Sequence, residues 1–492
     1  MKPIQYHSTN NPSHKVSFET ALLRGLAPDY GLYTIPRTDI PRLSPQLIRG
    51  MREMSMPEIA FEVLNPSIGA EIPKKKLEAL LQDAYSEDKI PTRMEKVIDN
   101  LYIMWLTDGP TYSFKDYAAR FYARALNYFL EKRKQKRVVI VATSGDTGGA
   151  IADALYGLDN VINIVFYPKG SISEGQRRQM TTLEGNVYAF EVNGDFNVCQ
   201  ALAKYLLGNK KFAQEVFGDP DRFTSANSIS VGRLLPQAVY PFFAYSRLPA
   251  DGKPMIASIP SGNLGDMMGT VIAWQMGLPI AKIVCGVNEN KEFPEFLRTG
   301  KYKVSKTAES PSSAMNVNHP SNLARLFDIF GGHMFDERDS VTKKVIKEGV
   351  IKVPPDRNAM NRDIFSVSID DEQHYKTMKE VYDKYGTILD PHGAVGWRAL
   401  EIFLAHEQSL RDNPAVIYET ADPGKFPDDV KKALGITPVL PPEMQAQANK
   451  QERIYSVNSE PTHIKEGTKE RLELSDAQVE EAKQEIKKIF KK

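Results

Sequence analysis

The stretch VVIVATSGDTGG, residues 138–149, sets the pattern that decides the fold. Its β-branched first half is typical of a short buried strand, and its glycine-rich second half leads into a helical segment that continues to residue 157. Strand-like and helical runs then alternate, with strands at 161–167 and 187–192 and helices at 174–183 and 196–207. Helices of this length connect parallel strands, so the alternation predicts a parallel α/β sheet with helices on both faces.

A second alternating region follows a long helical pattern at 234–246. Its expected elements are strands at 255–259, 283–287 and 416–420 and a helix at 265–276. Together the two regions predict an α/β protein with two open, largely parallel lobes and a cleft between them. Ligands of such sheets bind beyond the carboxyl ends of the strands.

The chain of 492 residues is longer than one domain usually is, so several lobes are expected. Short helical patterns broken by prolines predict a small, mostly helical N-terminal lobe over residues 1–90. The α/β region is expected to span 91–440, and its smaller lobe covers roughly 115–245. Residues 441–492 are polar and form the expected C-terminal tail, which ends in a charged helix at 476–492.

The composition excludes several classes of function. The chain is 41% hydrophobic and 25% charged with a net charge of +1, which is typical of a soluble globular protein and not of a nucleic-acid-binding one. Its two cysteines, Cys199 and Cys285, form no CxxC pair, so neither a disulfide framework nor a cysteine-rich zinc site is expected. No apolar run is long enough to cross a membrane, and no secretory signal is recognisable. The sequence therefore predicts a cytoplasmic protein without a bound metal.

The segment GPTYSFKD, residues 109–116, carries the most informative side chain, Lys115. An extended run at 101–106 ends here, and the helix that follows has an apolar side that includes Phe121 and Leu126. A lysine at such a turn is expected to point inward, where desolvation lowers the pKa of its amine. An amine of lowered pKa is suited to imine formation with an aldehyde. A lysine taken alone is more often a solvated surface charge, so this interpretation depends on the turns that follow.

Two glycine-containing turns are candidate anion sites. IPSGNLGD, residues 259–266, joins a strand to a helix and exposes backbone N–H groups at the helix N-terminus, where they favour a phosphate. TSGDTGG, residues 143–149, offers backbone donors and two hydroxyls, which suit a small carboxylate. Its glycines lack the GxGxxG spacing of a dinucleotide site. The alternative for either segment is a tight structural turn.

Two further segments place polar groups after strands. SANSISVGR, residues 225–233, presents an amide, hydroxyls and a guanidinium, and a guanidinium matches the shape of a phosphate or carboxylate. The alternative for Asn227 and Ser228 is a helix N-cap. ETADPGKFP, residues 419–427, ends the last strand, where Thr420 either presents its hydroxyl to the cleft or caps the strand. Two anion sites and one lysine indicate a phosphorylated cofactor and an anionic substrate.

Taken in order, these segments resemble the threonine synthase family, whose members are pyridoxal-phosphate enzymes of the tryptophan synthase β type, fold type II. The resemblance rests on SFKD, TSGDTG, SANSI followed by arginine, SGNLGD and TADPGKFP. It extends to the beginning of the chain, where YHSTN at 6–10 and LLRGLAPDYGLY at 22–33 are similar, and it covers residues 1 to about 435. It implies pyridoxal 5'-phosphate as the cofactor, bound in the cleft.

The resemblance also implies roles for residues at the cofactor. Lys115 corresponds to the lysine that binds the cofactor as an imine. Thr420 corresponds to the residue that meets the pyridine nitrogen. The cradle for the cofactor phosphate corresponds to Gly262, Asn263, Leu264 and Gly265.

On the substrate side, the implied reaction converts O-phospho-L-homoserine and water into L-threonine and phosphate, the last step of threonine biosynthesis. The loop that faces the substrate carboxylate corresponds to Ser144, Asp146 and Thr147. The positions that hold the substrate phosphate correspond to Asn227, Ser228 and Arg233. No macromolecular ligand is expected, and the protein is expected to be a monomer or a homodimer.

The sequence departs from the family pattern in two segments and leaves two alternatives open. Asp422 and Gly424 stand where members commonly have histidine and alanine, and Thr107 and Asp108 stand where many members have phenylalanine and histidine. Another fold type II lyase or dehydratase acting on a hydroxy- or phospho-amino acid would share Lys115 and the glycine turn but would not need Arg233. A non-catalytic paralogue that binds a phosphorylated ligand would not need the lysine.

Overall fold

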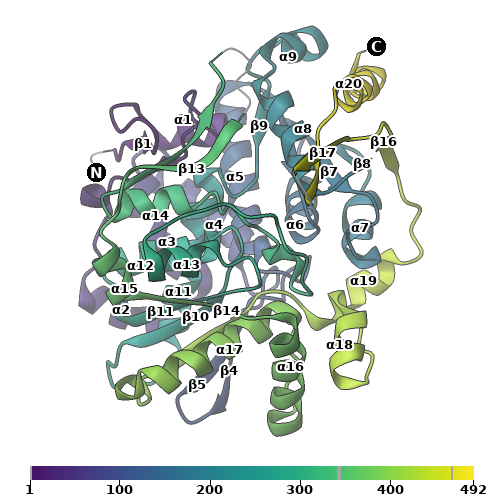
Figure 1. The fold of residues 1–492 in the computed structure, drawn as a ribbon. Helices are drawn as coiled ribbons and strands as arrows, with labels where there is room; N and C mark the ends of the chain where they lie inside the picture. Colours follow the sequence, from purple (N-terminus) through teal and green to yellow (C-terminus); the bar gives the residue numbers. More distant parts are fainter. Residues whose placement is uncertain (1–2, 341–344, 467–468, 492) are drawn as a thin grey trace. The chain divides into compact units, whose positions relative to one another are not determined.

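The computed structural model describes residues 3–340, 345–466 and 469–491 (Figure 1). Residues 1, 2 and 492, at the ends of the expected N-terminal lobe and terminal helix, lie outside the described residues. The chain divides into two compact units: unit 1 comprises Met1–Leu22, Leu26–Phe121 and Ser228–Val439, and unit 2 comprises Leu23–Gly25, Tyr122–Asn227 and Leu440–Lys492. Within the described part of the chain, no helix is both long and apolar enough to span a lipid bilayer.

Unit 1 contains a six-stranded sheet in the order β14-β11-β10-β15-β5-β4. Its strands are β4 (Arg93–Ile98), β5 (Leu101–Trp105), β10 (Met255–Pro260), β11 (Ile280–Val287), β14 (Ile364–Ser368) and β15 (Ala415–Glu419). All neighbouring strands are parallel except β4 and β5. The parallel α/β prediction is confirmed for β5, β10, β11 and β15, and the edge strands β4 and β14 extend the predicted sheet on both sides.

Two long helices cover this sheet. Ile103, Ile256, Val284 and Ile417, one each from β5, β10, β11 and β15, pack with Trp397 of α17 (Pro391–His406). The helix α12 (Gly265–Gln275) follows β10 directly. It passes close to the 3-10 helix η3 (Leu235–Ala238), because a Cβ at Gly269 would lie only 2.5 Å from the backbone carbonyl carbon of Gln237.

The remaining elements of unit 1 are short. The N-terminal part holds an antiparallel sheet of β1 (Tyr6–Ser8), β2 (Lys15–Val16) and β3 (Tyr33–Thr34), followed by α2 (Pro45–Gly50), α3 (Met56–Ile68) and α4 (Lys74–Tyr85). After β11 come α13 (Glu292–Thr299), α14 (Leu323–Ile329), the hairpin β12 (His333–Arg338) and β13 (Val345–Val353), α15 (Arg357–Asp363), α16 (Asp371–Tyr385) and, after β15, α18 (Pro427–Leu434). The helix α1 (Phe18–Arg24) begins in unit 1 and ends in unit 2, as does α5 (Lys115–Arg133).

The long helical pattern expected at 234–246 is interrupted in the structure. The chain forms α10 (Val231–Leu234), then η3, then α11 (Val239–Ser246). Pro236 lies within η3, and a proline inside a helix removes a backbone donor and crowds the preceding turn. The apolar pattern therefore predicts burial correctly but not a continuous helix.

Unit 2 contains a five-stranded parallel sheet in the order β16-β8-β7-β6-β9. Its strands are β6 (Arg137–Ala142), β7 (Val161–Pro168), β8 (Val187–Val192), β9 (Phe223–Ser225) and β16 (Ile454–Val457). The helices α6 (Asp146–Leu155) and α7 (Glu174–Thr181) pack on the face that carries Val165 and Tyr167. The helices α8 (Phe196–Gly208), α9 (Lys210–Phe217) and α20 (Asp476–Phe490) pack on the face that carries Ile164 and Phe166. Helices on both faces of a parallel sheet are what the alternation predicts.

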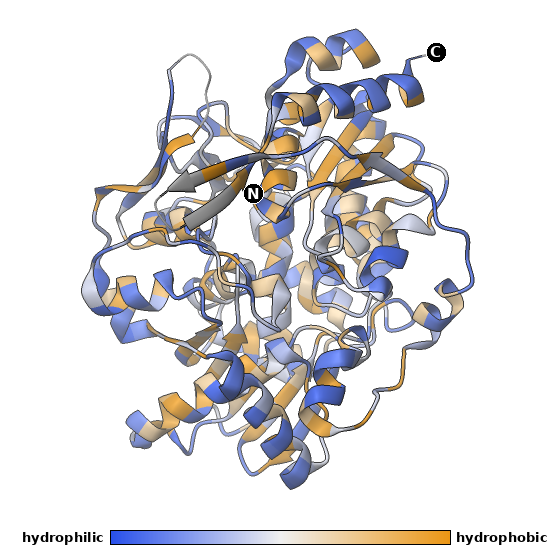
Figure 2. Cartoon of the chain, turned by 45° about the vertical axis from the view of Figure 1, so that its right-hand side comes forward, coloured by the Kyte–Doolittle hydropathy of each residue, from blue (hydrophilic) through white to orange (hydrophobic). Residues whose placement is uncertain are grey.

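The C-terminal segment from residue 440 belongs to the core of unit 2. After α19 (Pro442–Gln447), β16 adds a parallel edge strand to β8, and the hairpin β17 (Thr462–Glu466) and β18 (Lys469–Glu473) follows. The helix α20 is largely hydrophilic in Figure 2, yet Val479, Ala482 and Ile486 are buried in the same cluster as β6 and β7. The predicted terminal helix is present, and the polar tail around it also contributes a strand and part of a core.

Replacing Ile486 by alanine is expected to lower the free energy of unfolding by about 2–5 kcal/mol, because the side chain is fully buried and its removal leaves a cavity. Urea unfolding followed by circular dichroism measures the change. Gln484→Ala, on the exposed side of the same helix, is the control and should shift stability by less than about 0.5 kcal/mol. Equal unfolding midpoints for the two variants would contradict the packing of α20 on this core.

Candidate functional site

The loop that carries Lys115 is closed around the carboxylate of Asp116. Thr111 donates from its backbone N–H to Oδ2 of Asp116 at 2.8 Å and from its hydroxyl to Oδ1 at 2.6 Å. Gly109 is required beside this carboxylate, because a Cβ there would lie 2.6 Å from Oδ2. Tyr112 adopts a φ of +57°, which is uncommon for a residue with a side chain. These contacts make Lys115 the first residue of α5.

The same loop is hydrogen-bonded to the residues that follow β15. The backbone N–H of Phe114 donates to the carbonyl of Thr420 at 2.9 Å, and the N–H of Asp422 donates to the carbonyl of Tyr112 at 3.0 Å. Lys115, the next residue after Phe114, places its Nζ 3.8 Å from the centroid of the Phe114 ring. Two of the residues predicted for the cofactor, Lys115 and Thr420, are therefore brought together within unit 1.

The turn between β10 and α12 has the form of an anion site. Leu264 takes a left-handed conformation with φ 57°, and a Cβ at Gly262 would lie 2.7 Å from Cα of Met315. Among the described residues, none accepts a hydrogen bond from the backbone N–H groups of Gly262, Asn263, Leu264 and Gly265. Unpaired donors at the start of an 11-residue helix fit a phosphate group.

Asp266, the second residue of α12, couples this turn to Lys115. Its carboxylate accepts hydrogen bonds from the hydroxyl of Ser261 and, at 2.9 Å, from the backbone N–H of Met267. Burial raises the pKa of Asp266, and the hydrogen bond from Ser261 and the charge of Lys115 both act to lower it. The glycine turn follows β10 and Thr420 follows β15, and these two strands are parallel neighbours in the sheet. The glycine turn and the Lys115 loop, which is bonded to Thr420, therefore lie at the same edge of the sheet.

Asn263 has a side chain that is occupied by the protein itself. Its Nδ2 donates to the hydroxyl of Ser228, its Oδ1 accepts from the backbone N–H of Ser321 at 2.5 Å, and its carbonyl accepts from Nδ2 of Asn322 at 2.9 Å. The predicted cofactor cradle and the predicted phosphate-binding residue Ser228 are thus directly connected. Asn263 can offer a ligand its backbone N–H but not a free side chain.

Arg325 on α14 is a residue of this site that the sequence analysis missed. It is fully buried and donates to the carbonyls of Tyr33, Ser228 and Ile229 and to the amide oxygen of Asn322, over distances of 2.7–3.0 Å. Burial lowers the pKa of its guanidinium to about 9, which still leaves it charged at neutral pH. Its only signal in the sequence is an arginine inside the apolar run LARLFDIF at 323–330.

Arg233 lies on α10 and is 2% exposed. Its carbonyl accepts a hydrogen bond from Nε2 of Gln237 at 2.9 Å. The same Nε2 would lie 3.2 Å from a Cβ at Gly265, so Gln237 fills the space between α10 and the glycine turn. The structure therefore places Lys115, Thr420, the turn Gly262–Gly265, Ser228 and Arg233 in unit 1.

The other predicted residues, Ser144, Asp146, Thr147 and Asn227, lie in unit 2. The hydroxyl of Thr143 shapes their turn by accepting from the N–H of Gly145 at 2.9 Å and of Gly148 at 2.8 Å. Ser144 and Thr147 are half-buried, and within the described ranges the structure records no protein partner for either hydroxyl. Both hydroxyls are available to a small ligand.

Asp146 and Asn227 are engaged within unit 2. Oδ1 of Asp146 accepts from Nε2 of Gln176 at 3.1 Å, a contact that the sequence analysis did not include. The side chain of Asn227 donates to the carbonyl of Ala142 at 2.7 Å and accepts from its N–H at 3.2 Å. Asn227 therefore extends the end of β6 with its side chain, and its predicted contact with a substrate phosphate stays a prediction.

A buried acidic pair lies beneath Thr420. Oε1 of Glu419 accepts from the backbone N–H of Asp390 at 2.7 Å, and Oδ1 of Asp390 is 2.5 Å from Nδ1 of His392. Nε2 of His392 accepts from the N–H of Ala314 at 3.2 Å, so the proton of a neutral His392 is on Nδ1 and points at Asp390. Burial, together with Asp390, raises the pKa of Glu419 well above its ordinary value.

The two departures from the family pattern have separate surroundings. Asp422 accepts from the N–H of Gly424 at 2.7 Å, and burial raises the pKa of its carboxyl. Oδ2 of Asp108 lies 3.4 Å from Nε of Arg93, and the Asp108 side chain is partly exposed. Neither side chain interrupts the hydrogen bonds between the Lys115 loop and Thr420.

Comparison with known families matches almost the whole chain. The model described as "Threonine synthase N terminus" matches residues 5–85, "Pyridoxal-phosphate dependent enzyme" matches residues 98–418, and "Threonine synthase, C-terminal" matches residues 393–467. The second of these models alone covers more than half of the chain.

Characterised relatives and solved structures agree with these models. The threonine synthase of Haemophilus influenzae is 32% identical over 89% of this chain and 93% of its own length, and that of Pseudomonas aeruginosa is 34% identical over 92% and 95%. The structure of pyridoxal-phosphate-bound threonine synthase from Brucella melitensis covers 99% of this chain and matches over 100% of its own, with a TM-score of 0.84 at 28% identity. The Escherichia coli enzyme matches over 92% of this chain and 97% of its own, with a TM-score of 0.79 at 30% identity.

The three family models and the identity of 32–34% to these relatives over about nine tenths of the chain lead to one assignment. The chain belongs to the threonine synthase family of pyridoxal-phosphate-dependent enzymes, fold type II.

Proposed function

We propose that this protein converts O-phospho-L-homoserine and water into L-threonine and phosphate with pyridoxal 5'-phosphate as its cofactor. One observation carries the proposal. Within unit 1, the loop of Lys115 is hydrogen-bonded to Thr420 after β15, and the unpaired N–H groups of Gly262–Gly265 follow β10, the parallel neighbour of β15. A covalent anchor for an aldehyde and a cradle for a phosphate are the two features that this cofactor requires.

The residues of unit 1 fit the cofactor without rearrangement of the backbone turn. Lys115 would hold the aldehyde carbon, Thr420 would face the pyridine nitrogen, and the backbone donors of the glycine turn would bind the phosphate. Once bound, the cofactor supplies an electron sink that makes carbon-bound protons of the amino acid acidic. The remaining requirements fall on side chains of the protein.

Lys115 is also the group that we propose moves protons. The reaction removes protons from Cα and Cβ of the substrate, releases phosphate from Cγ, adds the hydroxyl of water at Cβ, and places protons on Cγ and Cα. A single amine that accepts and returns protons can serve these steps in turn. The Phe114 ring at 3.8 Å covers one side of Nζ and limits the positions that the amine can take.

The substrate's two anionic groups have separate candidate partners. The free hydroxyls of Ser144 and Thr147, on the turn that also carries Asp146, would bind the carboxylate. Arg233 and Ser228, with Asn227 as a further candidate, would bind the phosphate. Because Oγ of Ser228 accepts from Asn263, its own proton is left to donate to a ligand. Donors fixed in place before the reaction stabilise charge on the departing phosphate.

Further aspects of the proposal rest on composition and family. Cys199 and Cys285 are buried thiols without a disulfide, which fits a reducing compartment, so we place the protein in the cytoplasm. A monomer or homodimer without nucleic-acid, membrane or metal partners is part of the same proposal. The lobes 1–90, 91–440 and 441–492 are proposed as domains, and the family models at 5–85 and 98–418 support the first two.

The purified protein supplied with pyridoxal phosphate is expected to release equal amounts of phosphate and L-threonine from O-phospho-L-homoserine. Lys115→Ala should abolish both the visible absorbance of the bound cofactor and turnover, because it removes the anchor and the proton carrier. Lys132→Ala, on the exposed end of the same helix, is the matched control. Normal turnover by the Lys115 variant would refute the assignment.

Two assays separate the alternatives. A dehydratase would form 2-oxobutyrate when L-threonine is supplied, and a lyase acting on the phospho-amino acid would release phosphate from O-phospho-L-homoserine without forming L-threonine. A non-catalytic paralogue would show neither cofactor absorbance nor product. Any of these results with the parent protein would replace the proposed function.

Arg233→Lys is expected to raise KM for O-phospho-L-homoserine about tenfold, because an ammonium cannot reproduce the two-pronged contact of a guanidinium with phosphate. Inhibition by inorganic phosphate should weaken in parallel, while cofactor absorbance is retained. Steady-state kinetics with and without added phosphate measure both. If KM and phosphate inhibition stay as in the parent protein, Arg233 does not bind the substrate phosphate.

Burial of Glu419 makes the stability of the folded protein depend on pH. Its pKa is raised in the folded protein from an ordinary value of 4.5 by burial and by Asp390. The stability contributed by the neutral carboxyl is complete below the unfolded pKa and is lost as pH rises through the folded pKa. The loss therefore begins above pH 4.5 and continues toward alkaline pH.

Glu419→Gln should remove that loss, because the amide keeps an oxygen for the N–H of Asp390 and does not ionise. The difference in stability between variant and parent is expected to grow with pH by up to about 1.4 kcal/mol per unit. Thermal unfolding over a series of pH values from weakly acidic to weakly alkaline measures the difference. Glu401→Gln, exposed on α17, is the control, and parallel stability curves for Glu419→Gln would overturn this account.

A further inference from the structure

The glycine turn of unit 2 takes its shape from α7. A Cβ at Gly145 would lie 2.4 Å from Cδ of Gln176, and one at Gly148 would lie 2.4 Å from Sδ of Met180. A Cβ at Gly149 would lie 2.9 Å from Oε1 of Gln179 on the same helix. All three glycines of the turn are therefore in contact with one face of α7, and a shift of α7 would shift the turn.

A hydrogen bond between Gln176 and Asp146 also connects α7 to the turn. Gln176 is 2% exposed and donates from Nε2 to Oδ1 of Asp146 at 3.1 Å. Its Oε1 accepts from the N–H of Ser173 at 3.1 Å, within the capping box that begins α7. Asp146 stands between Ser144 and Thr147, the two hydroxyl residues of the turn. The first turn of α7 thus fixes the position of the residue between them.

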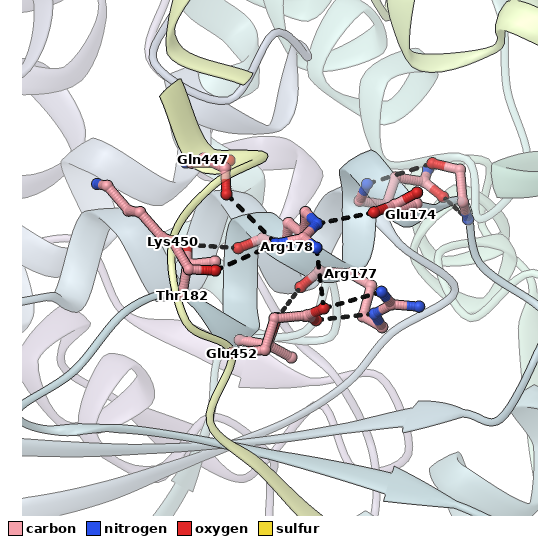
Figure 3. Close-up of polar contacts among 10 residues, drawn as sticks. Glu174, Arg177, Arg178, Thr182, Gln447, Lys450 and Glu452 are labelled. Carbon is pink, nitrogen blue, oxygen red and sulfur yellow. Dashed lines mark hydrogen bonds and ion pairs between the residues drawn. The ribbon is translucent and has the colours of Figure 1, made fainter. Parts of the chain in front are cut away.

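The opposite side of α7 is bound by Glu452 of the C-terminal segment (Figure 3). Arg177 donates to both oxygens of Glu452, from Nε at 2.8 Å and from Nη2 at 2.9 Å. The hydroxyl of Thr181 donates to Oε2 at 2.7 Å, and Arg178 approaches Oε1 at 3.5 Å. The hydrogen bond from Arg177 is the largest cause that lowers the pKa of Glu452, so the pair is ionised at neutral pH.

Backbone contacts hold the same segment along α7. Arg178 donates from Nη1 to the carbonyls of Lys450 at 3.2 Å and Gln447 at 3.4 Å, as Figure 3 shows. The N–H of Arg453 donates to the carbonyl of Thr181 at 2.6 Å. Gly175 lies against Met444, because a Cβ there would be 2.4 Å from Cε. The segment therefore lies along the length of the helix.

The segment is itself tied to the sheet that carries the glycine turn. Arg453 donates to the carbonyl of Val187, and β16 then pairs in parallel with β8 from Ile454 to Val457. The C-terminal part of this segment, β16, thus belongs to the sheet, and the residues before it contact α7. The half-buried ion pair of Glu452 is the charged contact between them.

We propose that Glu452 is a positioning residue for substrate recognition. By holding α7, it keeps Gln176 on Asp146 and keeps the hydroxyls of Ser144 and Thr147 where a substrate carboxylate binds. This inference rests on the proposed function, in which that turn takes the carboxylate. Residues 440–457 accordingly affect substrate binding indirectly, through α7, without contacting the substrate.

Glu452→Gln tests the proposal in the full-length holoenzyme. The variant keeps the size of the side chain but loses the charge that orients Arg177, so KM for O-phospho-L-homoserine should rise about tenfold with a smaller change in kcat. Inhibition by inorganic phosphate and affinity for pyridoxal phosphate should stay within about twofold of the parent, because Arg233 and Ser228, and the turn Gly262–Gly265 with Lys115, lie in unit 1, whereas α7 lies in unit 2. A general loosening of the fold would instead weaken substrate binding, inhibition by phosphate and cofactor affinity together.

A matched control and a second variant make the result decisive. Glu481→Gln changes the same residue type in the same C-terminal segment, where Glu481 accepts from the N–H groups of Asn458 at 3.0 Å and Ser459 at 2.7 Å but does not touch α7. It should leave KM unchanged. Thr181→Val removes one hydrogen bond to Glu452 at constant size and should raise KM by a smaller factor.

The route of the effect can be tested by combining substitutions. In a Gln176→Ala background, Glu452→Gln should raise KM by less than about twofold further, because the contact through which it acts is already gone. Independent effects of the two substitutions, or an unchanged KM in Glu452→Gln, would overturn the proposal. If the parent protein forms no threonine, the proposed function fails and not this inference alone.

Discussion

The site in unit 1 depends on the burial of one guanidinium. Arg325 is charged, fully enclosed, and bonded to three backbone carbonyls and one amide. A buried charge is tolerated only when its donors are satisfied, so the segments around Tyr33 and Ser228 must hold their carbonyls at this point. Through Asn322 the same constraint reaches Asn263 in the glycine turn. The turn Gly262–Gly265, which we propose as the cofactor cradle, and the segment around Ser228 are therefore positioned by one buried group.

The glycine turn of unit 2 is positioned by different interactions. Within this turn, the hydroxyl of Thr143 bonds the backbone of Gly145 and Gly148, while the hydroxyls of Ser144 and Thr147 are the ones that we propose bind a ligand. The packing of Gln176 and Met180 of α7 against the glycines adds a constraint from outside the turn. The helix is held in turn by the partly exposed ion pair of Arg177 and Glu452. Because such a pair is weaker than a network enclosed in the core, the orientation of this turn is more easily altered than that of the cradle.

The sequence predicts strands, helices and turns that local patterns encode, and it misses contacts between residues that lie far apart along the chain. The β-branched run at 138–141 and the turns at 143–149 and 259–266 are local, and the structure confirms their strands and helices. Arg325, Gln176 and Glu452 have partners between 30 and 292 residues away, so no spacing along the chain reveals them. Strand β16 is missed for a similar reason, since four residues in a polar tail become a strand only by pairing with β8.

The departure at Asp422 shows what the structure requires at that position. The contact with the Lys115 loop is made by the backbone N–H of Asp422, which donates to Tyr112 and does not depend on the side chain. The carboxylate caps the short helix η6 (Pro423–Lys425) by accepting from Gly424. That helix places the Nζ of Lys425 2.8 Å from the carbonyl of Thr111, on the loop that positions Lys115. A side chain that can accept one backbone hydrogen bond meets this need, so an aspartate and a histidine are both compatible with the anchor.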